Sequence, residues 1–399
     1  MDERVYWIWL QNAFGAGSAK PMQLVRRAGS AESLFRGGIG LWSSFTFVSD
    51  RELAALSAYG VREAEAALDY CLRLGQQVYT PDTPGYPDLL REIYNPPAVL
   101  YVRGTLPDAS GDIAIGVVGT RKAGKAGLRA AREISYELAQ EGAAVISGGA
   151  LGIDSEAHRG AIDGRGRTVA VLPCGLDYPY LMDNANLRRE ILDSGGALVT
   201  EYPMQTPVQR GAFQTRNRLI SGMAHGVLVA EAPKKSGALI TARYAAEQNR
   251  EVFVFIGEDT AAFAGCIGLA EDGAARIRTA EDILRAFSAQ RKSARTALLR
   301  QAAENVARPA RRVRVVPLSD SAAEAKADAE KTPAAAQPEA GLSADAQRVL
   351  ASLGGEPKHA AVLEAETGLS AGSVLAALTE LELLGKIRSY PGQRFTKSD

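Results

Sequence analysis

Residues 116–127 read GVVGTRKAGKAG, an apolar run that ends in glycines and is followed by a threonine, an arginine and two lysines. A strand that ends in glycines and leads into a helix points backbone N–H groups at an anion, and nearby cations strengthen that attraction. The candidates for holding a phosphate are Gly119, Thr120, Arg121, Lys122 and Lys125. Taken alone, the motif also fits a surface turn with incidental cations, because most charged residues are simply solvated.

The loop lacks the residues that would assign this phosphate to a nucleotide. A dinucleotide site has the pattern G-x-G-x-x-G and an acidic residue about 20 positions further on. Here the glycines stand at 116, 119, 124 and 127, and the next strand-like run ends in SGG. The P-loop pattern G-x-x-x-x-G-K-[ST] is also missing, which excludes a P-loop nucleoside triphosphatase.

Composition indicates a cytoplasmic globular protein of more than one domain. The chain has 399 residues and a formal net charge of zero, so a polyanion must be recognised by local clusters of charge. Its three cysteines are scattered and have no CxxC spacing, which argues against disulfides and a zinc site. The sequence shows neither a signal peptide nor an apolar run long enough to cross a membrane.

Six continuous apolar runs alternate with helix-like segments in the middle of the chain. Such runs are typical of strands buried on both faces, and the alternation predicts an α/β fold with a Rossmann-like, doubly wound, mostly parallel sheet. The predicted strands cover 113–119, 143–149, 168–175, 197–202, 226–232 and 251–257.

Composition divides the rest of the chain. We expect an N-terminal helical domain over 1–75, in which FGAGSAK resembles the glycine hairpin of a helix-hairpin-helix or SAM-like bundle, although a plain helix–helix turn fits equally well. The sheet domain should cover 79–287 and a disordered linker 288–340. Residues 341–399 show three helical periods and a hairpin, the outline of a winged helix.

The carboxyl ends of parallel strands meet at one edge of a sheet, where ligands bind in such folds. The predicted strand ends and the segment FQTRNRLISG (213–222) bring glycines, hydroxyls, cations and aromatic residues to this edge. A groove of this composition suits a single-stranded polyanion whose bases are free to stack.

These stretches also resemble a known family. Over about 79–284 the chain carries, in order, YPDLLREIYNPPAVLYVRG, GTR, SGGALGIDSEAH, AVLPCGLDYPY, TEYP, TRNRLISG and SGALITA. Together they resemble the DNA-processing protein A family (DprA, also called Smf). The resemblance implies a non-catalytic protein that binds single-stranded DNA and loads the recombinase RecA onto it during natural transformation. It also implies a homodimer through the Rossmann-like domain, and we expect no cofactor, metal ion or membrane association.

The resemblance maps the family's anion loop to Gly119, Thr120 and Arg121, its serine-glycine turn to Ser147 and Gly148, and its Arg-Asn-Arg to Arg216, Asn217 and Arg218. Arginine side chains can fork onto phosphate oxygens, while threonine and asparagine donate single hydrogen bonds. Further candidates near the same edge are Lys122, Lys125, Phe213, Lys234, Lys235 and Ser236. The alternative for Arg216 and Arg218 is a structural ion pair, and for each lysine a solvated surface position.

Some positions depart from the family pattern. Ile256 stands where proline is usual, and GCIGLAEDGA replaces the usual Gly-x-Asn-x-Leu-Ile, which puts the loop around Cys266 in doubt. Ala126 stands where the first loop often has an aromatic residue. The base-stacking platform would then be lost or moved to Phe213, Tyr178 or Tyr180.

Two other functions compete with this one. A Rossmann-like phosphoribohydrolase would need the motif P-G-G-x-G-T-x-x-E, but PKKSGALITARYAAE (233–247) lacks the double glycine and has Arg243 and Tyr244 near the place of the acid. A duplex-DNA regulator would use the winged helix, but its predicted third helix (371–385) holds Glu380 and Glu382 and no basic residue. Asp154 and His158, four residues apart, are expected to cap a helix and pack in the core rather than catalyse hydrolysis.

Overall fold

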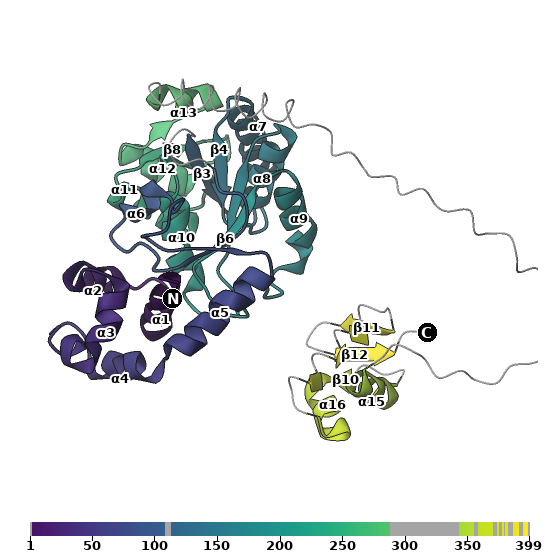
Figure 1. Cartoon of the computed structure of the whole chain (residues 1–399). Coiled ribbons are helices and arrows are strands. Elements are labelled where there is room, and N and C mark those ends of the chain that lie inside the picture. Colours follow the sequence, from purple (N-terminus) through teal and green to yellow (C-terminus); the bar gives the residue numbers. More distant parts are fainter. Residues whose placement is uncertain are drawn as a thin grey trace, which may run out of the picture. The chain divides into compact units, whose positions relative to one another are not determined.

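The six predicted strands form the centre of a nine-stranded sheet in the computed structural model, which describes residues 2–107 and 113–287 and, with gaps, parts of 343–397 (Figure 1). They pair in parallel, in the order β6-β5-β4-β3-β7-β8. Their bounds are β3 Ala114–Gly119, β4 Ala144–Ser147, β5 Thr168–Val171, β6 Ala197–Thr200, β7 Gly226–Glu231 and β8 Glu251–Val254. The Rossmann-like, doubly wound sheet is thereby confirmed.

Three short strands extend the sheet at its two ends. β2 (Leu100–Gly104) runs antiparallel to β6, and β1 (Gln77–Tyr79) runs antiparallel to β2. At the other end β9 (Ala275–Arg276) pairs in parallel with β8. These strands have only two to five residues, too few for a hydrophobic period to show in the sequence.

Alternate residues of the central strands fill two separate cores, one on each face of the sheet. On one face, residues such as Val118 and Val229 pack with α10 and α11; on the other, Val117 and Leu228 pack with α7, α8 and α13. The helices around the sheet are α6 Asp88–Arg91, α7 Lys125–Gln140, α8 Ile153–Asp163, α9 Ala185–Asp193, α10 Ala212–Gly222, α11 Ala238–Glu247, α12 Ala264–Glu271 and α13 Ala280–Ala286. Burial on both faces explains why these strands read as continuous apolar runs.

The N-terminal helices enclose the apolar segment near the start of the chain. α1 buries all residues from Val5 to Gln11. Both of its tryptophans make hydrogen bonds: Trp9 Nε1 donates to the Leu56 carbonyl at 3.1 Å, and Trp7 Nε1 donates to Asp82 at 2.9 Å. The bundle consists of α1 Arg4–Phe14, α2 Lys20–Ala28, α3 Ala31–Trp42, α4 Asp50–Ala58 and α5 Val61–Arg73. The expected helical region is therefore present, and it belongs to the same compact unit as the sheet.

A buried ion pair connects this bundle to the sheet. Arg218 in α10 donates through Nη2 to both carboxylate oxygens of Glu201, at 2.5 and 2.6 Å, and the two side chains are 2% and 3% exposed. The turn after α1 uses the same carboxylate, because the N–H of Gly17 donates to Glu201 Oε1 at 2.7 Å. Gln11 donates to the Glu201 carbonyl. One glutamate thus binds the glycine turn and α10 together.

His158 illustrates how α8 is held against the sheet. Its ring is fully buried, and Nδ1 lies 2.7 Å from Thr168 Oγ1, whose hydroxyl donates to the Val145 carbonyl at 2.8 Å. Nε2 has no hydrogen-bond partner among the described residues. Burial lowers the pKa of His158 from 6.5 to about 3, so the ring stays neutral. The core-packing interpretation of His158 fits this geometry.

The described C-terminal elements belong to a second compact unit. Its described parts include α15 Ala344–Ser352, α16 Ala360–Thr367 and a three-stranded sheet in the order β10-β12-β11. The strands are β10 Lys358–His359, β11 Ile387–Tyr390 and β12 Arg394–Lys397. Much of the predicted third helix (371–385), and the predicted linker over 288–340, lie outside the described residues.

The ion pair gives a testable expectation for stability. Glu201→Ala leaves the Arg218 charge buried without its partner, which should lower the free energy of unfolding by about 3–5 kcal/mol. Replacing both residues, as in Glu201→Leu with Arg218→Met, should recover part of this loss because no charge is then buried.

Denaturant unfolding measures the effect, with Glu92→Ala as the control. Glu92 also pairs with an arginine, Arg250, at 3.4 Å, but its side chain is 65% exposed, so its loss should be worth about 1 kcal/mol or less. Equal destabilisation by Glu201→Ala and Glu92→Ala would contradict the structural importance of the buried pair.

His158 gives an expectation for pH. The pKa of His158 is about 3 in the folded protein and 6.5 in the unfolded chain, so below pH 6.5 the unfolded chain binds the extra proton. The free energy of unfolding should therefore fall as the pH drops below 6.5, and His158 should account for about 1.4 kcal/mol of this loss per pH unit. His158→Asn keeps a donor for Thr168 and should flatten this dependence. The free energy of unfolding of the wild type and of His158→Asn is measured at pH 7 and pH 5. The same loss of stability between the two pH values in both proteins would show that another group is responsible.

Candidate nucleic-acid interface

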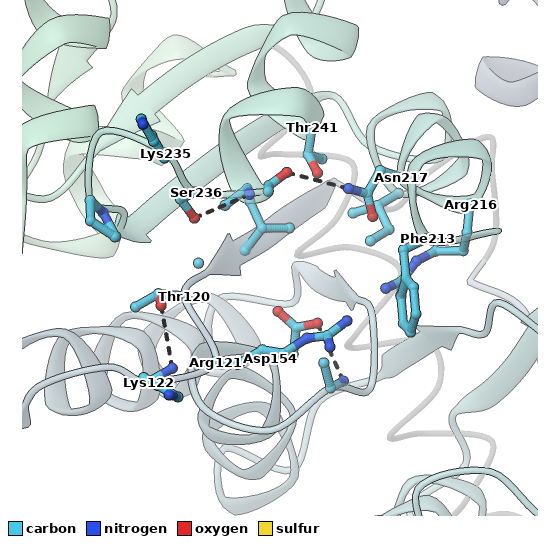
Figure 2. A pocket seen from close by; sticks show the side chains of 17 residues that line it. Thr120, Arg121, Lys122, Asp154, Phe213, Arg216, Asn217, Lys235, Ser236 and Thr241 are labelled. Atoms are coloured by element: carbon cyan, nitrogen blue, oxygen red, sulfur yellow. Dashed lines mark hydrogen bonds between the residues drawn. The ribbon is translucent and has the colours of Figure 1, made fainter. Parts of the chain in front are cut away.

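A pocket of about 420 Å³ lies where the winding of the sheet changes direction. The chain proceeds from β3 through β4, β5 and β6 on one side and through β7, β8 and β9 on the other, so the carboxyl ends of β3 and β7 flank the topological switch point. Figure 2 shows side chains from several elements converging there. The lining residues are Val118, Gly119, Thr120, Arg121, Lys122, Ala150, Asp154, Phe213, Arg216, Asn217, Ile220, Pro233, Lys235, Ser236, Gly237, Ala238 and Thr241.

The loop after β3 forms one wall of the pocket. The N–H of Thr120 donates to the Glu231 carbonyl at 2.9 Å, and Thr120 Oγ1 accepts from the N–H of Lys122 at 3.3 Å. Arg121 and Lys122 are exposed, and the Arg121 guanidinium lies 4.4 Å from the centre of the Phe213 ring. This wall therefore presents two accessible cations, one of them stacked on an aromatic face.

The start of α11 forms the opposite wall. Lys235 is exposed, and the half-buried Ser236 accepts from the N–H of Ala238 at 3.3 Å, which orders the first turn of the helix. Lys235 and Ser236 stand across the pocket from Thr120 and Lys122 in Figure 2. A helix amino terminus with a neighbouring lysine favours negative charge. Both walls of the pocket thus attract anions.

Arg216 lies deeper in the pocket than the sequence suggests. Its side chain is 4% exposed, Nη1 donates to the Val171 carbonyl at 2.5 Å, and Nε has no hydrogen-bond partner among the described residues. Burial lowers the pKa of Arg216, and the carboxylate of Asp154 opposes that shift. A Cβ on Gly148 would lie 2.1 Å from Arg216 Nη1, so this close approach requires glycine at position 148.

Arg218 does not reach the pocket. Its guanidinium points to Glu201 instead, in the buried ion pair that binds the N-terminal turn. The two arginines of the Arg-Asn-Arg motif therefore face different environments, and the ion-pair alternative is the one that the geometry of Arg218 supports. Asn217 lies between them in sequence and lines the pocket, with Nδ2 3.5 Å from the Gly237 carbonyl.

Three further predicted residues, Ser147, Lys125 and Lys234, do not line the pocket. Ser147 is fully buried and donates to the Val117 carbonyl at 2.6 Å, so its hydroxyl is used inside the protein. Lys125 and Lys234 are exposed but do not line the pocket. Three polar residues at or beside the pocket were not among the sequence candidates for binding: the pocket-lining Asp154 and Thr241, and Glu231 beneath the loop.

The helix amino terminus after the first loop already faces an anion, and that anion belongs to the protein. Both carboxylate oxygens of Glu231 lie 3.0 Å from the N–H of Gly124, the residue that precedes α7. The N–H of Gly124 is therefore already bonded within the protein, and the expectation that this loop holds a ligand phosphate stays a prediction. At the opposite wall, the N–H groups of the first turn of α11 also have partners within the protein, so α11 offers an anion the positive end of its dipole and the neighbouring Lys235.

The described residues show no sign of a metal site or a membrane span. No group of three or more histidine, cysteine or acidic side chains among them is placed to bind a metal ion. The cysteines at 71, 174 and 266 are all buried as free thiols. In the described part of the chain, no helix has the length and apolar character needed to cross a bilayer.

Comparisons with known proteins agree with this architecture. Residues 77–288 match the family model of DNA recombination-mediator protein A, and residues 333–393 match that of the DprA winged helix domain, which confirms the predicted winged helix. Protein Smf of Synechocystis is 38% identical over 326 residues, 80% of each chain.

Two solved structures are similar as well. DNA processing protein A of Streptococcus pneumoniae has 26% identity and a TM-score of 0.61, covering 71% of this chain and 98% of that one. DNA processing protein A of Helicobacter pylori, described as binding single-stranded DNA, has 28% identity and a TM-score of 0.48, covering 53% and 95%. The family model and the extent of the match to protein Smf lead to one conclusion: the chain belongs to the DNA recombination-mediator protein A (DprA/Smf) family.

Proposed function

We propose that the protein binds single-stranded DNA in the pocket between the β3 loop and α11 and acts in the cytoplasm as a recombination mediator. The observation that carries this proposal is the pairing of the two walls: Arg121, stacked on Phe213, stands opposite Lys235 and the amino terminus of α11. Such an arrangement of cations, a helix amino terminus and an aromatic ring matches what a single strand offers, namely phosphates and unpaired bases.

The residues take different parts in the proposed contact. Arg121, Lys122 and Lys235 are exposed and hold phosphate oxygens. The hydroxyls of Thr120 and Ser236 add single hydrogen bonds. Bases meet the half-buried Phe213 ring and the apolar floor of the pocket, which includes Val118, Ile220 and Ala238. Arg216 contributes positive charge from below, and Arg218 contributes by holding α10 in place.

An enzymatic function receives less support. A phosphoribohydrolase would need an acid from the helix after the phosphate loop, but the acid on α11, Glu247, is 58% exposed near the end of that helix and pairs with Arg243 at 3.5 Å. Asp154 is the carboxylate that lines the pocket, and it faces the Arg216 charge. We therefore propose a binding protein without catalytic activity; release of free base from AMP would overturn this part.

Membership of the family supports a finer proposal. We propose that the protein loads RecA onto the bound strand during natural transformation. For the winged helix we propose an auxiliary or protein-contacting part, because Glu380 accepts hydrogen bonds from the N–H and hydroxyl of Ser343, at 2.8 and 2.5 Å, and so has a structural use. Tighter binding to duplex than to single strands of equal length would favour the rival function of a duplex regulator.

The first test is charge reversal at Arg121. This side chain is exposed, so its replacement should leave folding intact, whereas changes at the buried Arg216 would mix binding with stability. With roughly four phosphates neutralised, log affinity should fall with log salt at a slope near −3, at about 0.7 per phosphate. Arg121→Glu should weaken binding to all sequences alike and lower that slope by about one phosphate's share.

Fluorescence anisotropy across a salt series provides the measurement, with Arg243→Glu as the matched control. Arg243 is 66% exposed on α11 and does not line the pocket. Equal losses in the two variants would mean that the pocket is not the binding site. Stimulation of RecA assembly on the same strands, present in the wild type and lost with Arg121→Glu, would extend the test to the mediator function.

The second expectation concerns assembly. We propose a homodimer through the sheet domain, which would present two pockets to one strand. Sedimentation velocity at tens of micromolar protein should then show a single dimeric species. A monomer at that concentration would remove the basis for a strand that spans two pockets.

A further inference from the structure

Glu231 fills the site where other doubly wound proteins bind the phosphate of a nucleotide. It is the last residue of β7, its side chain is 2% exposed, and both of its carboxylate oxygens lie 3.0 Å from the N–H of Gly124 at the start of α7. In such folds the first helix amino terminus at the switch point receives a nucleotide phosphate. Here a carboxylate of the chain itself takes that position.

The surrounding backbone is shaped to receive this carboxylate. A Cβ on Gly127, in the first turn of α7, would lie 2.2 Å from Glu231 Oε2, so only glycine leaves room for the side chain. Glu231 forms no ion pair with a cation among the described residues. Its charge is balanced by the N–H of Gly124 and the positive end of the 16-residue helix α7.

The same residue also fixes the loop that carries Arg121. Its backbone carbonyl accepts from the N–H of Thr120 at 2.9 Å, on the near side of Arg121, and its side chain accepts from Gly124 on the far side. Both ends of the segment 120–124 are therefore anchored to one residue. Since the N–H groups of Thr120, Lys122 and Gly124 have partners within the protein, the loop offers an anion mainly its cationic side chains.

We propose that Glu231 is a specificity-determining residue that excludes free phosphate and the phosphates of mononucleotides from the α7 terminus. A small anion meets a filled and negatively charged site there, and the dispersed cations of the pocket hold it weakly. A DNA strand binds because several of its phosphates are engaged at once. The selection of strands over nucleotides rests on the proposed function, whereas the exclusion of free phosphate does not.

The test removes the carboxylate and asks whether phosphate takes its place. Glu231→Ala vacates the cradle formed by Gly124 and Gly127, and orthophosphate or AMP should then bind there at least tenfold more tightly than to the wild type. Phosphate at ten times its Kd should raise the Tm of this variant by roughly 3–6 °C, relative to chloride at equal ionic strength. The Tm of the wild type should not differ between the two salts.

Glu247→Ala is the matched control, because it removes one negative charge from the exposed end of α11, away from the cradle. Isothermal titration with AMP gives a second readout. If Glu231→Ala is folded and its response to phosphate equals that of Glu247→Ala, the proposal is wrong. If Glu231→Ala does not fold without phosphate, the same measurements are made on Glu231→Ser. Failure of both variants to fold in 50 mM phosphate would also reject the proposal, because bound phosphate should replace the contacts that the carboxylate made.

Single-strand binding is measured on the same proteins, so that the two proposals fail separately. If the wild type does not bind DNA, the proposed function is overturned, but the comparison of phosphate binding between the wild type and Glu231→Ala still tests the role of Glu231. A wild type that binds DNA, together with a Glu231→Ala variant that gains no phosphate site, would overturn only the role given to Glu231.

Discussion

The ion pair between Arg218 and Glu201 determines where α10 lies, and α10 supplies one side of the pocket. Residues two apart on a helix project from nearly opposite sides, so Arg218 can reach Glu201 only when Arg216 turns toward the pocket. The same carboxylate binds the N–H of Gly17, so the N-terminal bundle shares in this constraint. A change in the N-terminal turn would therefore reach the pocket through a single buried glutamate.

Three carboxylates lie in or near a pocket that attracts anions, and each has a positional use. Glu201 holds Arg218, Asp154 faces Arg216, and Glu231 holds the β3 loop. A buried guanidinium without a nearby carboxylate would lose its hydration without compensation, so such cations need acidic partners. The exposed cations Arg121 and Lys235 have no such need, and the proposed phosphate contacts fall mainly on them.

Much of the fold was predictable because it depends on patterns that are local in sequence. Strands buried on both faces read as apolar runs, and parallel strands place their carboxyl ends at one edge, which located the pocket. What could not be predicted depends on the direction in which neighbouring side chains point. Arg216 and Arg218 are indistinguishable in the string TRNR, and Ser147 resembles a ligand-binding hydroxyl until its bond to the Val117 carbonyl is seen. The sequence did contain a signal for Glu231, an acid at a strand end beside the phosphate loop.

The stack of Arg121 on Phe213 links the two halves of the proposed interface. The Phe213 ring has two neighbours: the Arg121 guanidinium lies 4.4 Å and the Tyr180 ring 6.2 Å from its centre. In the protein alone, the Arg121 guanidinium covers one face of the Phe213 ring. In the proposed complex, a base and Arg121 would therefore compete for one ring, and the arginine would be released toward a phosphate when the base arrives. Stacking and charge neutralisation would then occur together, as a site that binds strands of any sequence requires.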